Sequence, residues 1–273
     1  MKVPNNTSFW DQRRGKIFSK KGGWRIGQGV FCHGYSMMDD FVGKLSYMQV
    51  VMLNATGRLP ERRLADWMEG IYICLSWPDP RIWCNQIGAL GGSIHTSAPA
   101  SVAAGILALD SRAYGTRPII DGIKFIKSAL VQFNTGISVS EIIERQSKEQ
   151  RGKPQIMGYA RPIAKGDERI AAMERVTEAL GFEVGAHMKL AYQIEEVLNS
   201  EYDESMNING YGAAFIADQG FTEQETYQMI SMIGASGVTA CYVDQMNSVA
   251  ESFLPLRCDD ITYEGKPLRS VPE

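Results

Sequence analysis

Apolar side chains recur with helical spacing along most of this chain. Between Met38 and Ala55 they fall on one broad face, as in an amphipathic helix, and Gly57 to Pro60 ends the pattern. The sequence predicts further helices over residues 61–75, 119–133, 139–148, 166–180 and 187–199, another that begins near residue 82, and one from residue 223 that Thr222 caps. Residues 206–218 are small and apolar, and residues 233–246 are again rich in small residues. Residues 1–35 read as irregular structure with some extended backbone. The chain is therefore expected to be mainly helical.

One stretch stands out, from Asp79 to Asp121. Its middle, Ser97 to Leu109, consists almost entirely of small residues, which allow helix backbones to approach closely, so we expect it to run through the centre of the fold. We expect the Gly91-Gly92 pair to separate it from the helix before it. A polar elbow at residues 111–118 follows, with Tyr and Arg beside Gly and Pro, and such an elbow favours a functional site. The alternative is a core helix followed by a solvated turn.

The bulk composition narrows the class of protein. The 273 residues are 44% hydrophobic and 22% charged, which is ordinary for a soluble globular chain, and the net charge of −3 gives no overall attraction for nucleic acid. No apolar run reaches the roughly 18 residues that a membrane span requires. The polar N-terminus and five irregularly spaced cysteines favour a reduced, cytoplasmic protein. The three histidines lack zinc-ligand spacing, so we expect no metal. From the net charge and the short apolar runs we expect no nucleic-acid or membrane partner.

Five motifs in order resemble the citrate synthase family. Residues 34–60, GYSMMDDFVGKLSYMQVVMLNATGRLP, are similar to the family's opening motif, and the stretch from Asp79 aligns without a gap on its "HELNAS" to "LHGG" region. The segment GYARPIAKGDER at 158–169 is similar to "GFGHPvYk-GDPR" with one residue missing. Asn207 to Gly212 matches part of "PNVDfysG", and TYEGKPLRSVP at the C-terminus matches the last motif. The chain lacks the stretch before "HELNAS", so it resembles the short members, close to citryl-CoA lyases in size.

The resemblance implies an all-α, citrate synthase-type helical fold. It implies a large helical domain of residues 1–115 and 221–273, a smaller inserted helical domain of residues 116–220, and a homodimer. It also implies a CoA thioester and a carboxylate as small-molecule partners, with the thioester as substrate rather than as a tightly bound cofactor. Such enzymes make or break a carbon–carbon bond between an acyl-CoA and a 2-oxo acid.

The positions of the family's catalytic groups have all changed in this chain. Asn209 takes the place of the carboxylate base, and it has no titratable proton to exchange. Tyr114, Arg161 and Asp79 stand where the family has three histidines. Tyr114 can donate a hydrogen bond to a carbonyl or enolate oxygen, and Arg161 offers a fixed positive charge. Asp79 is the nearest remaining carboxylate by motif. Each has a structural alternative: a core Tyr, an Arg in an ion pair, and a turn residue between two prolines.

Three arginines are candidates for holding a substrate carboxylate. The resemblance implies this role for Arg169, which keeps the "GDPR" arginine. Arg117 is a possible third member of an anion pocket with Arg161 and Arg169, and the alternative is a solvated surface residue. Arg257 lies one residue from the position of the arginine that the family supplies from its partner subunit.

Two functions stay open at this point. The first is a divergent enzyme with a rebuilt site, which the polar character of the replacements favours because a decayed pocket would fill with apolar residues. The second is a catalytically inactive homologue that binds an anionic metabolite or regulates a partner, which the loss of the standard catalytic groups favours. The likeness in motifs does not choose between them.

Overall fold

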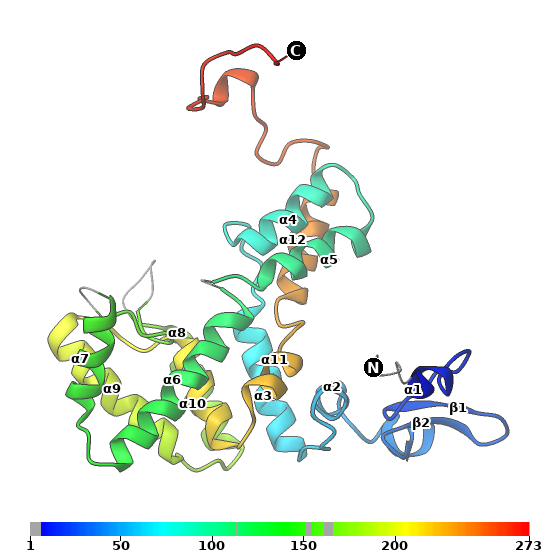
Figure 1. Cartoon of the computed structure of the whole chain (residues 1–273), viewed down its shortest axis with the longest axis vertical. Coiled ribbons are helices and arrows are strands. Elements are labelled where there is room, and N and C mark those ends of the chain that lie inside the picture. Colours follow the sequence, from blue (N-terminus) through cyan, green and yellow to red (C-terminus); the bar gives the residue numbers. More distant parts are fainter. Residues whose placement is uncertain (1–6, 113, 151–153, 161–165, 273) are drawn as a thin grey trace, which may run out of the picture. The chain divides into compact units, whose positions relative to one another are not determined.

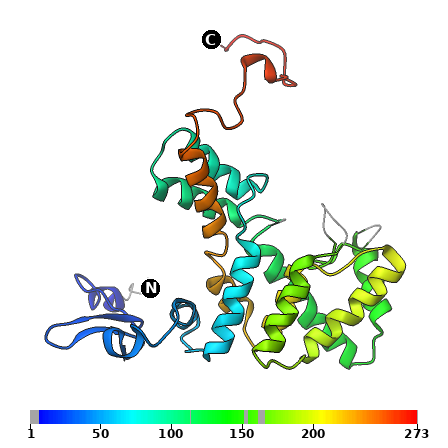
Figure 2. The same cartoon turned by 180° about the vertical axis from the view of Figure 1, so that it is seen from behind.

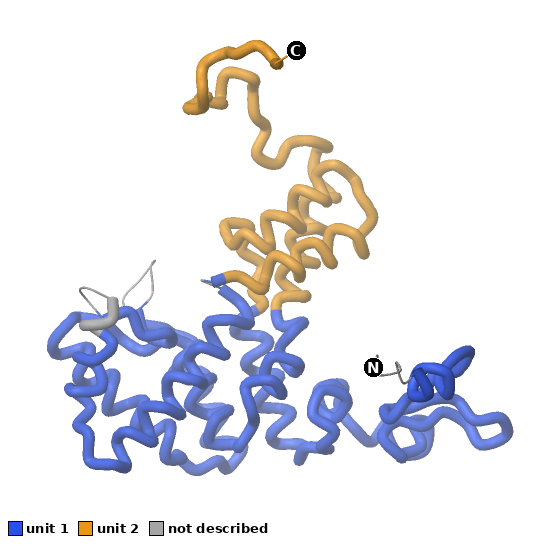
Figure 3. Tube along the Cα trace, viewed as in Figure 1, with its two compact units in different colours: residues 1–75, 112–233 blue, residues 76–111, 234–273 orange. Residues whose placement is uncertain are grey.

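The computed structural model describes residues 7–112, 114–150, 154–160 and 166–272. Helices dominate, so the expected all-α class is confirmed (Figure 1). Packing divides the chain into two compact units, shown in blue and orange in Figure 3. Unit 1 is Met1–Leu75 with Arg112–Ile233, and unit 2 is Ser76–Ser111 with Gly234–Glu273. This division differs from the large and small domains implied by the resemblance, and that assignment stays a prediction.

The N-terminal part of unit 1 carries a small antiparallel sheet, which the hydrophobic pattern did not predict as strands. Gly22 pairs with Cys32 in the first ladder, and Cys32 pairs with Tyr35 in the second. Cys32 packs with Phe41 and Leu53, so the sheet is joined to the following helices by a small apolar cluster. The elements are α1 (Ser8–Asp11), β1 (Gly22–Arg25), β2 (Gly29–Cys32), β3 (Tyr35–Ser36), a π-helix η1 (Met37–Phe41) and α2 (Tyr47–Thr56).

The single helix expected over 38–55 is therefore two elements. Ser36 caps η1 and Ser46 caps α2, where Gln49 completes a capping box by accepting from the Ser46 N–H. These two caps compete with a continuous helix, because each satisfies the free N–H groups of a new helix start. The apolar periodicity continued through the break and concealed it.

The rest of unit 1 is a helical bundle. Its helices are α3 (Arg62–Leu75), α6 (Thr116–Asn134), α7 (Val139–Gln150), α8 (Glu168–Ala179), α9 (Ala186–Tyr202), α10 (Ile208–Asp218) and α11 (Glu223–Met229). Helix α10 packs against both α6 and α9, and α3 packs beside α8, as the reverse view in Figure 2 also shows. The predicted Thr222 cap of α11 is confirmed, with a capping box to Glu225.

A buried polar chain ties α3, α8 and α10 together. The Trp67 indole N–H donates to Thr177 Oγ1 at 2.8 Å, and the Thr177 and Tyr211 hydroxyls are 2.8 Å apart. The Trp67 ring also stacks on Phe215 with 3.6 Å between centroids, and Trp67 is fully buried. Because each polar atom of these three side chains has a partner, their hydrogen bonds fix the relative positions of the three helices without leaving an unsatisfied group.

Unit 2 contains α4 (Trp83–Ser93), α5 (Ala98–Leu109), α12 (Ala235–Met246) and a short 3-10 helix η2 (Cys258–Asp260). The Gly91-Gly92 pair does not separate two helices, because α4 continues to Ser93 and the break follows at Ile94. The close approach of α12 requires a glycine at position 92, since an added Cβ would lie 2.3 Å from the Tyr242 carbonyl oxygen.

The small-residue helix α5 is less buried than its sequence suggested. Only Ser101, Gly105 and Leu109 are buried, one residue per turn, while Leu107 is 81% exposed. The close backbone approach is confirmed at Gly105, where an added Cβ would lie 2.8 Å from the Cys84 carbonyl oxygen. The expectation that this helix runs through the centre is wrong for the single chain, since it contacts α4 and α12 along one narrow stripe.

Candidate functional site

The C-terminal end of α3 brings two of the predicted residues together. The Tyr114 hydroxyl donates to the Leu75 carbonyl oxygen at 3.0 Å, and Arg169 Nη1 donates to the Cys74 carbonyl oxygen at 3.3 Å. The last carbonyls of a helix lack partners within the helix and carry its negative dipole end, so they attract such donors. Tyr114 comes from the elbow before α6 and Arg169 from the first turn of α8. The two side chains thus meet neighbouring backbone positions although 55 residues separate them in sequence.

A buried carboxylate that the sequence analysis did not single out holds Arg169. Asp167 Oδ1 accepts from Arg169 Nε at 2.7 Å and Oδ2 accepts from Arg169 Nη2 at 2.6 Å. The Asp167 side chain is 0% exposed and that of Arg169 is 18% exposed. Burial alone would raise the pKa of the Asp167 carboxyl. Hydrogen bonds from the Arg169 side chain and from the Ile208 N–H outweigh it, so the pKa lies below its ordinary value.

The same carboxylate reaches the start of α10, which carries Asn209. The Ile208 N–H donates to Asp167 Oδ2 at 2.9 Å, and Asn207 caps α10 by accepting from the Asn209 N–H at 2.9 Å. Asn209 Oδ1 is buried and has no hydrogen-bond partner among the described residues. Tyr114, Asp167, Arg169, Asn207 and Asn209 together form what we call the polar cluster. An N-cap Asp or Asn just before a helix was the sequence signal for its two additional members.

The segment before Arg161 is also anchored to this cluster. Asn207 Nδ2 donates to the Ala160 carbonyl oxygen at 2.7 Å, and Tyr159 and Met206 form an isolated β-bridge. Gly158 makes the approach possible, because a Cβ there would lie 2.5 Å from the Gly210 Cα. Arg161 itself lies outside the described residues, so its predicted role stays a prediction.

The other described candidates belong to other elements of the chain. Arg117 is exposed on the first turn of α6. Asp79 and Arg257 belong to unit 2. Arg257 is exposed just before η2, where its N–H donates to Asp260 Oδ2 at 2.7 Å. Asp79 is paired with Arg81, with Nη2 at 2.7 Å from Oδ2. This hydrogen-bonded pair holds the pKa of the Asp79 carboxyl below its ordinary value, which makes it a weaker base.

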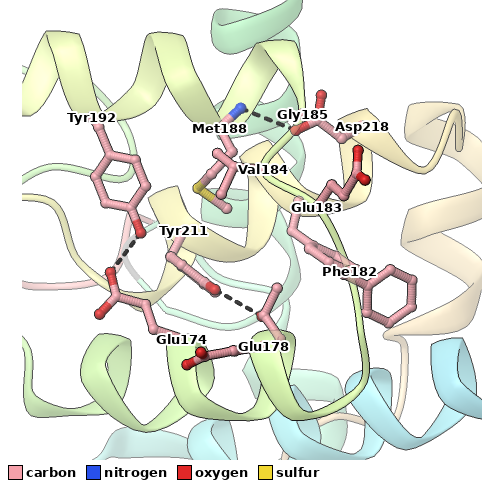
Figure 4. A pocket seen from close by; sticks show the side chains of 12 residues that line it. Glu174, Glu178, Phe182, Glu183, Val184, Gly185, Met188, Tyr192, Tyr211 and Asp218 are labelled. Atoms are coloured by element: carbon pink, nitrogen blue, oxygen red, sulfur yellow. Dashed lines mark hydrogen bonds between the residues drawn. The ribbon is translucent and has the colours of Figure 1, made fainter.

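A cavity of about 320 Å³ opens in unit 1 between α8, α9 and α10. Figure 4 shows Tyr192 hydrogen-bonded to Glu174 on one side and Asp218 bonded to the Met188 N–H on the other. None of the predicted site residues lines this cavity. The part of the chain that the structure describes contains no group of His, Cys, Asp and Glu that would hold a metal ion. None of its helices has the length and apolar character to span a bilayer.

Comparison with known proteins identifies the fold. No protein-family model and no curated protein sequence matches the chain. Among solved structures, citryl-CoA lyase from Hydrogenobacter thermophilus is 23% identical with a TM-score of 0.77, over 94% of this chain and 97% of that one. ATP citrate lyase from Methanothrix soehngenii, solved with citrate and coenzyme A, is 15% identical with a TM-score of 0.76, over 98% of this chain but 45% of that one.

Citrate synthase from Thermotoga maritima is more distant, at 18% identity and a TM-score of 0.61, over 84% of this chain and 60% of that one. The resemblance suggested by the five motifs is thus confirmed at the level of structure, along nearly the whole chain. This protein has the citrate synthase fold, in the short form that citryl-CoA lyase takes.

Proposed function

We propose that this protein makes or breaks a carbon–carbon bond between an acyl-CoA and a 2-oxo acid. The observation that carries the proposal is the meeting of Tyr114 and Arg169 at the end of α3, in a chain that has the fold and length of citryl-CoA lyase. In the cleavage direction, the bond between the thioester α-carbon and the hydroxyl-bearing carbon breaks. The hydroxyl loses its proton, the α-carbon gains one, and an acyl-CoA and a 2-oxo acid are released.

The polar cluster supports two of the roles that this chemistry needs. Arg169 suits a substrate carboxylate, because a guanidinium presents parallel N–H groups to it. Tyr114 suits a carbonyl or enolate oxygen, and it would exchange its bond to the Leu75 carbonyl for one to the ligand. We expect Arg161 to add a second positive charge, since the backbone before it is fixed to α10.

The proposal extends to the assembly and setting of the protein. We infer a cytoplasmic homodimer that uses the CoA thioester as substrate and needs no tightly bound cofactor. Arg117 and Arg257 are proposed to contribute to carboxylate binding. In the synthetic direction, the protein would be a transferase that converts the acyl group into an alkyl group on transfer.

A second function is favoured by the state of the candidate bases. Asn209 cannot take a proton, and Asp79 is engaged by Arg81 with a lowered pKa. A protein with anion-binding groups and no free base would bind a carboxylate or a CoA ester without turning it over. We therefore keep an inactive homologue that senses an anionic metabolite, or regulates a partner, as the alternative.

Turnover and binding assays separate the two functions. The protein is incubated with acetyl-CoA or propionyl-CoA and a series of 2-oxo acids, and in reverse with citryl-CoA, and the CoA species are followed by chromatography. Turnover that falls in Tyr114→Phe and Arg169→Lys, but not in the exposed controls Tyr47→Phe and Arg175→Lys, supports the enzyme. Binding without turnover supports the alternative; a ligand at 100 times its Kd stabilises the protein by about 2.7 kcal/mol, which a thermal shift resolves. The absence of both binding and turnover would contradict both functions.

A further inference from the structure

We propose that Asp167 is a positioning residue that sets how Arg169 is presented to an anionic ligand and links it to the helix that carries Asn209. This inference rests on the proposed function, because it concerns the same cluster. Asp167 is the aspartate of the "GDPR" motif, to which the sequence analysis gave no role, and it does not itself face a ligand, since its side chain is fully buried.

Hydrogen bonds hold both oxygens of the Asp167 carboxylate in place. Oδ1 accepts from both the N–H and the Nε of Arg169, at 3.2 and 2.7 Å, while Oδ2 accepts from Arg169 Nη2 at 2.6 Å and from the Ile208 N–H at 2.9 Å. Four donors from two helix starts thus converge on one carboxylate. Removing any one of them would leave a buried charge with fewer partners, so the arrangement resists change.

The arrangement decides which edge of the guanidinium stays available. An arginine side chain has five N–H donors, and Asp167 and the Cys74 carbonyl take three of them, one each on Nε, Nη1 and Nη2. These contacts within the described part of the chain leave one N–H on Nη1 and one on Nη2. Because Asp167 occupies the edge formed by Nε and Nη2, a ligand carboxylate would approach the remaining N–H groups from a direction that the buried pair fixes.

A second Asp–Arg ion pair in the same chain shows which contacts form from the local sequence alone. Asp79 and Arg81 have the same spacing, and Asp79 Oδ1 accepts from the Arg81 N–H at 2.9 Å while Oδ2 accepts from Nη2 at 2.7 Å. The Arg81 side chain is 81% exposed, and among the described residues the Asp79 carboxylate accepts hydrogen bonds from Arg81 alone. The Asp-x-Arg clamp is thus a local structure; at Asp167 it is buried and extended to α10.

The alternative role for Asp167 is that of a helix cap alone. It is the N-cap of α8, and its side chain accepts from the N–H two residues on. Asparagine caps helices about as well as aspartate, but it cannot accept the paired guanidinium bonds and the Ile208 N–H with two oxygens. Asp167→Asn therefore preserves the cap and removes the clamp.

The experiment uses the full chain with Asp167→Asn, Arg169→Lys and the double variant. The control is Asp66→Asn, which breaks an Asp–Arg pair of similar length, 2.7 Å, whose Arg62 is exposed. Calorimetry measures the Kd of citrate and of CoA. Nitrogen-15 NMR follows the Arg169 Nε–H, assigned by its loss in Arg169→Lys, which reports the clamp without any ligand.

If Asp167 positions Arg169, Asp167→Asn weakens citrate binding about tenfold, as expected for one charge-assisted hydrogen bond, and leaves CoA binding and the control unchanged. It also shifts or broadens the Nε–H signal, and it adds no further loss in the Arg169→Lys background. Unchanged citrate affinity in Asp167→Asn, or losses that add in the double variant, would overturn the proposal while the proposed function stands. A protected Nε–H in a wild type that binds neither citrate nor CoA would overturn the proposed function and reduce Asp167 to a structural clamp.

Discussion

At the scale of single residues, Asn209 gives the sharpest prediction. It sits where the citrate synthase motif has a carboxylate, in the first turn of α10, where a helix start favours negative charge. We expect Asn209→Asp to supply the missing base, so that the variant exchanges the methyl protons of acetyl-CoA with solvent. Proton NMR of acetyl-CoA in deuterium oxide measures this exchange. The wild type is the control, and a variant that binds acetyl-CoA yet exchanges nothing would show that residue 209 does not face the thioester.

Asp167 predicts a pH effect whose sign follows from its lowered pKa. A carboxyl whose pKa falls on folding contributes stability above its unfolded pKa of about 3.9, and this contribution is lost as the pH falls through the folded pKa. Urea unfolding of wild type and Asp167→Asn at several pH values tests it. The gap between their free energies of unfolding should be largest near neutral pH and should narrow below about pH 4. A gap that does not change with pH would contradict a charged Asp167.

Single residues also show how much of the candidate site could be predicted from the sequence. The motif positions named Tyr114, Arg169 and Asn209, and the structure brings these three to neighbouring helix ends. They did not reveal that Arg81 holds Asp79, because a motif specifies a position and not the partner of a side chain. Nor did they reveal the role of Asp167, although it lies in the "GDPR" motif, because that role depends on a hydrogen bond to Ile208, 41 residues away in sequence.

At the scale of elements, the contact of α4 with α12 predicts a large effect from one methyl group. A Cβ on Gly92 would lie 2.3 Å from the Tyr242 carbonyl oxygen and 3.0 Å from the Met246 nitrogen. Since both neighbours are backbone atoms, we expect Gly92→Ala to destabilise this contact by about 1–3 kcal/mol. Hydrogen exchange of residues 235–246 measures it, with Gly23→Ala, whose Cβ meets nothing within 4 Å, as control. Equal protection in both variants would show that the helices separate easily.

Helix positions were predictable where a cap and the apolar period agree. Thr222 and Glu225 fixed the start of α11 in this way. The same pattern failed at Gly91-Gly92, because glycine inside a helix can reflect a close neighbour as well as a break. It also overestimated the burial of α5, since a run of small residues indicates close approach on one side and says nothing of the other sides.

At the scale of the whole molecule, we predict a dimer. The resemblance implies one, and the chain exposes large apolar side chains after residue 253, among them Leu256, Leu268 and Val271, at 76, 106 and 88% exposure. Since burial of such side chains is favourable, we expect a second copy of the chain to cover them. Sedimentation equilibrium should give about twice the chain mass of 30.3 kDa. A mass of one chain across the micromolar range would contradict it.

The pairing of Arg169 with Asp167 has a consequence for how a ligand arrives. Since a buried negative charge lies 2.6 Å from the guanidinium, the two together present little net charge to the solvent. This pair should then contribute little to the long-range attraction that accelerates the encounter of many anions with basic clefts. Arg169 would act through oriented N–H groups at short range, and it would add little to the dependence of a carboxylate's association rate on ionic strength.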